Sequence, residues 1–231
     1  MRGQQSVLIA GGAALLGGIA AALAYAAWWR KNPSACPYEQ RFFLEVPHPF
    51  LTRARLRRIL APRPGERVLE VGPGTGYYTL DIAQQIAPDG VLEILDLQQE
   101  MLDHTMRKVS ERHITNIVPT QGDAQELPYP DDTFDAAYMT VTLGEVPDQD
   151  AALCELRRVL KPDGRLVVGE IFGDPHMVTF GSLRASAEEA GLRFELRLGG
   201  KLAYFARFRA PGPATPVLML NCSAITDKLD A

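Results

Sequence analysis

Strand-like and helix-like segments alternate along the chain from about Glu66 onward. Short apolar runs typical of buried strands occur at 67–71, 91–96, 116–123, 134–141 and 165–172. Segments with helical periodicity occur at 77–87, 99–112, 149–160 and 182–191. Strands separated by helices of this length imply right-handed crossovers and a parallel sheet that is covered on both faces. The sequence therefore predicts an α/β fold.

The end of this region predicts a hairpin. Two strand-like runs, 194–198 and 203–208, flank Gly199 and Gly200. A connection this short makes the final strand antiparallel in an otherwise parallel sheet.

Composition limits the possible functions. The chain has 231 residues, 46% of them hydrophobic, which suits one domain with a sizeable core and an appendage. A net charge of −4 gives no electrostatic footprint for DNA or RNA, so no nucleic-acid partner is expected. The three cysteines are far apart and form no CxxC or Cys/His pattern, so no metal site is expected.

A glycine turn follows the first strand, in "VLEVGPGTG". Gly72, Gly74 and Gly76 stand where the backbone of an open α/β sheet comes close to a ligand. A dinucleotide fingerprint requires GxGxxG, with its third glycine at position 77, which here is Tyr77. The spacing ExGxGxG from Glu70 favours S-adenosylmethionine (SAM) over a dinucleotide.

Two acids end the next strands. Asp96 follows Gly72 by 24 residues, the reach needed to accept the hydroxyls of an adenosine ribose. A surface aspartate that caps the following helix is the alternative. Asp123 ends the third strand, where its carboxylate can take the adenine amine, with the N–H of Ala124 available to a ring nitrogen.

Four segments together resemble one family. "VLEVGPGTG", "LDLQQEML", "GDAQELPYPDDTFD" and "LRRVLKPDGRLVV" occur in the order and spacing found in class I SAM-dependent methyltransferases, and the sequence is most similar to the ubiquinone and menaquinone C-methyltransferase group. The resemblance covers roughly residues 53–209. It implies a seven-stranded Rossmann-like sheet, with SAM as the cofactor across the ends of the first four strands.

The resemblance also implies roles for individual residues. Glu70 would anchor the methionine ammonium, the three glycines would admit the methionine and ribose, and Asp96 would hold the ribose. Leu97 and Met101 would flank the adenine, and Asp123 with Ala124 would recognise its edge. Thr140 and Thr142 would face the methyl group, and Tyr77 or Tyr78 would border the cofactor or simply pack.

The chain departs from the family after the fourth strand. Many relatives have a His-containing segment there, whereas this chain has "TLGEVPD". A base within reach of the acceptor is still needed to remove a proton from an oxygen or carbon acid. The candidates are Glu145, Glu170 and His176, although for each of them a loop residue without a catalytic part is the favoured alternative.

The N-terminal segment, residues 1–31, predicts a membrane anchor. Residues 6–29 carry no charge, and as a helix they would be roughly 36 Å long, enough to cross a hydrocarbon core of roughly 30 Å. Trp28 and Trp29, followed by two basic residues, favour a single-pass helix with the rest of the chain in the cytoplasm. A cleaved signal peptide and a helix buried in a complex are the alternatives. Small residues recur every four positions and would suit a homodimer.

The remaining segments flank the methyltransferase domain, expected at 53–210. Residues 32–52 form a Pro-broken, aromatic connector or lid, in which Phe42, Phe43 and Phe50 either cover an acceptor pocket, dip into the membrane interface or complete the core. The next helix, "LTRARLRRILAP", is amphipathic and basic. The tail at 211–231 is Pro-rich and predicted to be disordered.

These observations predict a membrane-anchored SAM-dependent methyltransferase acting on a small, lipophilic acceptor such as a quinone-like ring or a lipid. Two alternatives stay open. One is a SAM-binding membrane scaffold without catalysis, for which the unusual segment after the fourth strand leaves room. The other is an NAD-type oxidoreductase, which the glycine spacing and Asp123 oppose.

Overall fold

A computed structural model describes residues 32–43 and 49–212 of the protein. Seven strands form one sheet in the order β3-β2-β1-β4-β5-β7-β6. Their bounds are β1 (Arg67–Val71), β2 (Val91–Asp96), β3 (Ile117–Gln121), β4 (Phe134–Thr140), β5 (Leu160–Ile171), β6 (Arg193–Gly199) and β7 (Ala203–Arg209). The first five strands pair in parallel, and β7 is antiparallel to both β5 and β6. The expected Rossmann-like sheet with a C-terminal hairpin is confirmed.

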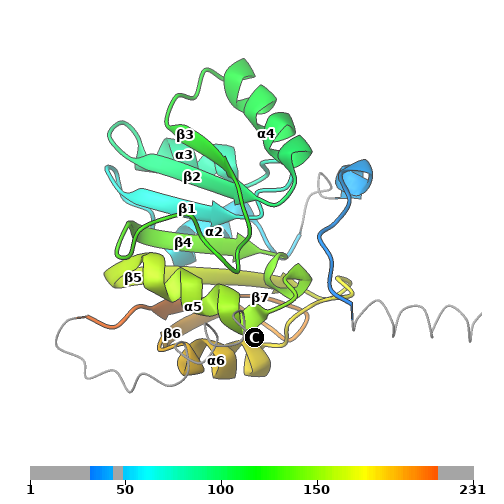
Figure 1. The fold of residues 1–231 in the computed structure, drawn as a ribbon, viewed down its shortest axis with the longest axis vertical. Helices are drawn as coiled ribbons and strands as arrows, with labels where there is room; N and C mark the ends of the chain where they lie inside the picture. The colour runs from blue at the N-terminus through cyan, green and yellow to red at the C-terminus, as the bar shows by residue number, and fades with distance from the viewer. Residues whose placement is uncertain (1–31, 44–48, 213–231) are drawn as a thin grey trace, which may run out of the picture. The chain divides into compact units, whose positions relative to one another are not determined.

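Helices cover both faces of the sheet. They are α2 (Arg53–Leu60), α3 (Thr79–Ile86), α4 (Gln99–Glu111), α5 (Gln149–Val159) and α6 (Phe180–Glu189), with short 3-10 helices η1 (Tyr38–Phe43) and η2 (Leu143–Glu145). Figure 1 shows α5 and α6 in front of the sheet, with α2 and α3 behind it. Each face has its own core, one packed under α5 and α6 and the other under α2, α3 and α4.

Two elements show what sets their bounds, a local cap in α2 and pairing with another strand in β5. Thr52 caps α2 by accepting a hydrogen bond from the Arg55 N–H, and Leu56, Ile59 and Leu60 of that helix are buried. Strand β5 begins earlier than expected, because Leu160 already pairs with Phe134 of β4. The register of the two strands then shifts between Phe134 and Ala136.

The parallel strands carry the site. Because β1, β2, β4 and β5 run in the same direction, their carboxyl ends meet at one edge of the sheet. The chain reverses its strand order between β1 and β4, which is the switch point where α/β sheets bind ligands.

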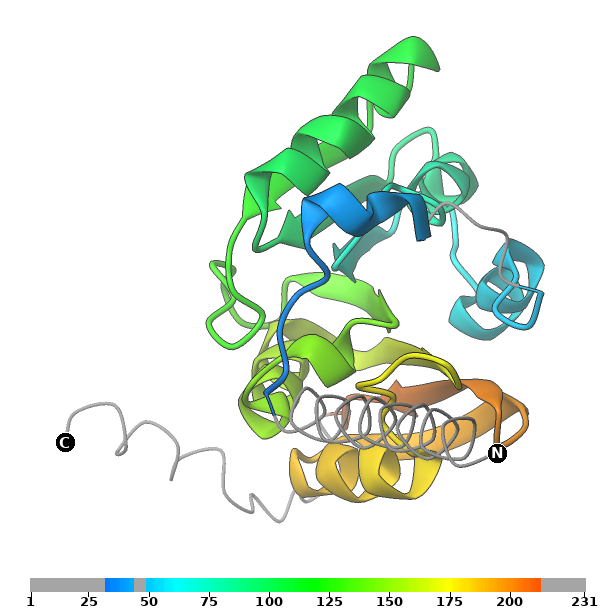
Figure 2. The same cartoon turned by 90° about the vertical axis from the view of Figure 1, so that its right-hand side faces the viewer.

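Several expectations fall outside the described residues. The anchor helix at 6–29, its homodimer stripe and most of the tail at 211–231 belong there. Within the two described ranges, no helix is long and apolar enough to cross a bilayer. The connector is described in part, and Figure 2 shows its helix η1 beside α4. Phe42 and Phe50 are more than half exposed, so they do not complete the core.

Candidate functional site

The glycine turn after β1 brings the backbone close to its neighbours. Gly72, Gly74 and Gly76 all have positive φ angles, of 70°, 54° and 78°. A Cβ at Gly72 would overlap the Thr142 side chain, lying only 2.5 Å from its Oγ1. A Cβ at Gly76 would lie 2.9 Å from Cγ2 of Thr105. Glycine is therefore required for both the conformation and the space.

Helix α4 holds this turn in place. The Thr105 hydroxyl donates to the Gly74 carbonyl at 2.9 Å, and the Lys108 ammonium donates to the Thr75 carbonyl at 3.0 Å. The Gly72 N–H donates to the Leu95 carbonyl of β2 at 2.8 Å. These hydrogen bonds hold the turn in one conformation, and two of its carbonyls, those of Gly74 and Thr75, accept from side chains of α4.

Glu70 lies buried at the base of the turn. It is 2% exposed and accepts a hydrogen bond of 2.6 Å from the Thr79 hydroxyl. Burial raises the pKa of Glu70 to about 7, against the opposing effect of the Thr79 hydrogen bond. A cationic ligand group nearby would favour the carboxylate, so this residue suits the ammonium role that the resemblance implies.

Asp96 lies at the end of β2, next to the turn. It is 8% exposed, and its Oδ1 accepts from the Gln98 N–H at 3.0 Å. Burial raises the pKa of Asp96, while backbone hydrogen bonds from Gln98, Gly74 and Leu97 oppose that rise. The Leu97 side chain is 57% exposed and Met101 is buried, so the two proposed adenine neighbours differ in accessibility.

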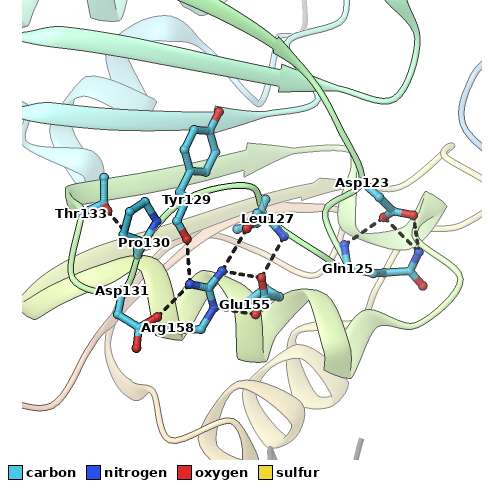
Figure 3. Close-up of polar contacts among 9 residues, drawn as sticks. All are labelled: Asp123, Gln125, Leu127, Tyr129, Pro130, Asp131, Thr133, Glu155 and Arg158. Atoms are coloured by element: carbon cyan, nitrogen blue, oxygen red, sulfur yellow. Dashed lines mark hydrogen bonds and ion pairs between the residues drawn. The ribbon is translucent and has the colours of Figure 1, made fainter. Parts of the chain in front are cut away.

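Asp123 begins a loop that connects β3 to β4. Its carboxylate accepts from the Gln125 N–H at 2.9 Å and from the Gln125 side-chain amide at 3.0 and 2.9 Å (Figure 3). Asp123 is exposed, whereas Ala124 is buried in the core. A carboxylate has about four acceptor positions, so capacity for a further donor remains.

The segment after β4 faces the turn. Val141 has φ of 56°, a conformation that is strained for a β-branched residue. Its neighbour Thr142 donates to the Thr140 carbonyl at 3.1 Å and lies against Gly72. The Thr140 hydroxyl is buried without a hydrogen-bond partner among the described residues. Strain and an unsatisfied polar atom at one place are typical of a ligand site.

The three candidate bases lie near the carboxyl ends of β4 and β5: Glu145 in η2, Glu170 at the end of β5 and His176 in the segment after β5. Glu170 is 1% exposed; its Oε2 accepts from the Val178 N–H at 3.2 Å, and its Oε1 has no partner among the described residues. Burial raises the pKa of Glu145 to about 8 and that of Glu170 to about 8, and the charge of Asp174 contributes to both. The backbone N–H of His176 donates to the Asp174 carboxylate at 2.6 Å. Carboxyls with these pKa values can exchange a proton near neutral pH.

The connector reaches across this edge of the sheet. The Cys36 N–H donates to Oε2 of Glu145 at 3.2 Å, and the Gln98 side chain donates to the Cys36 carbonyl at 2.9 Å. One connector residue thus links the segment after β2 to the segment after β4.

Tyr77 and Tyr78 pack against each other, and Tyr78 is buried in the core. Tyr78 is 6% exposed, and its hydroxyl donates to the Leu51 carbonyl at 2.6 Å. Its ring packs edge-on against Tyr77 and Phe205 in the α2 side of the core. Packing therefore accounts for Tyr78, and its proposed role beside the cofactor stays a prediction without support from this contact pattern.

Sequence patterns missed some of the site. Asp174, Gln98, Cys36 and the strained Val141 were not singled out as site residues. Only Asp174 had a visible signal, its position two residues before His176. The others depend on contacts across 62 to 109 residues of chain, or on a backbone angle, neither of which leaves a local motif.

The residues of this edge fit SAM as a group. The turn admits a ligand backbone, Asp96 offers a carboxylate beside it, and the Thr140 hydroxyl lacks a partner. Comparison with known proteins supports this assignment: residues 48–182 match the ubiE/COQ5 methyltransferase family. The chain belongs to this family. SAM is the methyl donor of these enzymes, so the ubiE/COQ5 assignment agrees with the glycine spacing.

Relatives in the ubiE/COQ5 family carry quinone-related names. The chain is 40% identical over 109 residues to the ubiquinone/menaquinone biosynthesis C-methyltransferase UbiE of Teredinibacter turnerae, a match covering 47% of this chain and 44% of the relative. It is 37% identical over 119 residues to the demethylmenaquinone methyltransferase of Lactobacillus johnsonii, covering 51% and 49%. The chain thus matches about half the length of these relatives.

Solved structures confirm the fold. A SAM-dependent methyltransferase from Aquifex aeolicus superposes with a TM-score of 0.71 at 21% identity, covering 76% of this chain and all of the other. The [4+2]-cyclase SpnF superposes with a TM-score of 0.62 at 20% identity, covering 69% and 80%. The same fold thus occurs in proteins named for different reactions, so the fold alone does not give the reaction.

Proposed function

We propose that the protein is a SAM-dependent methyltransferase that acts on a small molecule. The observation that carries the proposal is the turn at Gly72, Gly74 and Gly76, packed against Thr142 and joined by Asp96 at the switch point of the sheet. Family membership over more than half of the chain supports it.

The residues of the site divide the work. SAM supplies an already activated methyl group when bound. Glu70, the glycine turn and Asp96 would bind and orient it, and Asp123 with Ala124 would hold the adenine. Orientation alone can contribute up to about 7–11 kcal/mol of a reaction barrier. The ionised carboxylate of Glu145 or Glu170, made more basic by burial, would take the proton that the acceptor loses, with His176 as the third candidate.

Calorimetric titration of the full chain in detergent tests the cofactor. SAM and S-adenosylhomocysteine are expected to bind at micromolar levels, and NADH is not. Binding of NADH alone would instead support the oxidoreductase alternative. Turnover with labelled SAM then separates an enzyme from a SAM-binding scaffold, because a scaffold binds the cofactor without transferring label.

For the acceptor, we propose a lipophilic, quinone-like molecule or a lipid. The names of the relatives support the quinone-like class. Methyl transfer from labelled SAM to a membrane extract checks this, and organic extraction separates the products. Label found only in water-soluble metabolites would count against a lipophilic acceptor.

We also propose that residues 6–29 form a single-pass membrane anchor, with the methyltransferase domain in the cytoplasm. The support is the uncharged stretch and the aromatic and basic residues that follow it. Alkaline extraction of membranes from expressing cells should leave the full chain in the pellet, and protease added to sealed cells should spare the domain. Release by alkali would overturn the anchor.

A further inference from the structure

The loop from Asp123 to Asp131 is tied to helix α5 at several points, and no step of the proposed reaction uses these contacts. At the end of α5, the Arg158 guanidinium donates to the Tyr129 carbonyl at 2.7 Å and to the Leu127 carbonyl at 3.0 Å (Figure 3). The same guanidinium binds Asp131 at 2.8 Å. One side chain therefore holds three points of the loop.

Glu155 completes the arrangement from one turn earlier on α5. Its carboxylate accepts from Arg158 at 2.7 Å and from the Leu127 N–H at 2.8 Å. Glu155 is 21% exposed and Arg158 is 32% exposed, so the pair is partly shielded from water. A planar guanidinium can make several such bonds in fixed directions, which an ammonium cannot reproduce.

The other end of α5 reaches the same loop. Asp148, the cap residue of α5, donates its N–H to Oε1 of Gln125 at 3.0 Å. The amide of Gln125 in turn donates to both oxygens of Asp123. The carboxylate expected at the adenine edge is therefore oriented through contacts that begin at Asp148, the cap of α5.

We propose that Arg158, together with Glu155, is a positioning residue that sets the base selectivity of the cofactor site by holding the Asp123–Asp131 loop. This inference rests on the proposed function, because it takes the ligand of the loop to be the adenosyl group of SAM. Asp123 would accept a hydrogen bond from the exocyclic amine of adenine, which hypoxanthine lacks. Arg158 fixes the loop that carries Asp123 at three other points, Leu127, Tyr129 and Asp131, so the loss of Arg158 should affect adenine more than hypoxanthine.

The test compares two ligands that differ only at this edge of the base, S-adenosylhomocysteine and S-inosylhomocysteine, by calorimetric titration of the full chain in detergent. Hypoxanthine has a carbonyl oxygen in place of the amine and a hydrogen on N1. The unmodified protein is expected to prefer the adenine ligand by about 10- to 100-fold, as for one hydrogen bond to a charged group. Arg158→Ala should weaken the adenine ligand by a similar factor and leave the hypoxanthine ligand nearly unchanged. The preference should then fall to a few-fold or less.

Three controls separate positioning from simple loss of stability. Arg157→Ala removes the neighbouring arginine, for which no hydrogen bond or ion pair is found among the described residues, and should keep the full preference. Arg158→Lys keeps the positive charge but lacks the planar guanidinium, so this variant should show only part of the preference for the adenine ligand. Hydrogen exchange should speed up at 123–131 in Arg158→Ala and not in α6.

The outcomes distinguish this inference from the proposed function. If the unmodified protein binds neither ligand, the proposed function fails. If it prefers the adenine ligand, and a folded Arg158→Ala or Arg158→Lys protein keeps that preference in full, the function stands and the positioning role is overturned.

Discussion

At the scale of single residues, the glycine turn shows how one missing side chain shapes the site. Thr142 occupies the space beside Gly72 that a Cβ would need, and the backbone there has a positive φ. The contact joins the ends of β1 and β4, the two strands at which the order of the sheet reverses. Any larger residue must therefore displace the Thr142 side chain.

Gly72→Ala should lower the free energy of unfolding by about 1–3 kcal/mol and weaken SAM binding, because the new Cβ meets Thr142 in a strained conformation. Urea denaturation and calorimetric titration measure the two effects. Adding Thr142→Ala should recover part of both losses, since it removes Oγ1 and Cγ2. Gly181→Ala is the matched control, because Gly181 lies in α6 and no atom lies within 4 Å of the position that a Cβ would take there. This change should leave the free energy of unfolding unchanged or raise it slightly.

Asp96→Ala should weaken SAM binding by about 10- to 100-fold if its carboxylate accepts the ribose hydroxyls. Calorimetric titration with S-adenosylhomocysteine measures the change. Asp103→Ala provides the comparison, because this exposed aspartate of α4 bonds only to Gln99 among the described residues, and its loss should leave affinity unchanged. Equal affinities in all three proteins would remove Asp96 from the site.

At the scale of elements, a buried ion pair joins α2 to the sheet. Arg165 of β5 donates to Glu66 at 2.6 Å, and its Nε donates to the Leu60 carbonyl at the end of α2 at 2.9 Å. The two side chains are only 7% and 11% exposed. The pair thus secures the helix that precedes β1 and the glycine turn.

Arg165→Ala should lower the free energy of unfolding by about 3–5 kcal/mol, because the largely buried Glu66 carboxylate loses its charged partner and keeps only the Arg63 N–H among the residues that the structure describes. Chemical denaturation measures the loss. Arg184→Ala breaks the exposed pair with Glu188 within α6 and should cost no more than about 0.5 kcal/mol. Similar losses of unfolding free energy in the two variants would show that the Glu66–Arg165 pair stabilises the protein no more than an exposed pair does.

At the scale of the whole molecule, several buried carboxyls make stability depend on pH. Burial raises the pKa of Glu70 to about 7 and that of Glu170 to about 8. In the unfolded chain such groups titrate near 4.3, so between about pH 4.5 and 8 the folded protein binds more protons. The free energy of unfolding therefore falls as pH rises through this range. Asp135 and Glu195 have lowered pKa values, and their opposite effect acts only at more acidic pH.

Urea denaturation from pH 5 to pH 9 should show this decline, with a slope of up to about 1.4 kcal/mol per pH unit for each such carboxyl. Glu170→Gln removes one titrating group and should make the slope shallower, chiefly between pH 5 and 8. Glu188→Gln, on the exposed face of α6, should leave the slope unchanged. A slope in Glu170→Gln equal to that of the unmodified protein would contradict the assignment.

Local patterns were sufficient for most of the fold. The apolar runs and the intervening helical periodicity located all seven strands and the five helices of the sheet domain, with errors at their ends. The start of β5 at Leu160 is one such error, since it depends on pairing with Phe134 of another strand. The position of β7 between β5 and β6 likewise depends on pairing, although the hairpin itself was evident from Gly199 and Gly200.

The α/β alternation, the glycine turn and the acids at the strand ends can be identified from the amino-acid sequence, because each depends on residues close together in the chain. Which distant groups meet depends on the fold: Cys36 with Glu145 across 109 residues, Arg165 with Glu66 across 99, and Arg158 with the loop after β3. Such contacts follow from the crossing of strands and helices in space. Burial at those crossings then raises the pKa values of Glu70, Glu145 and Glu170, a property that no residue type carries alone.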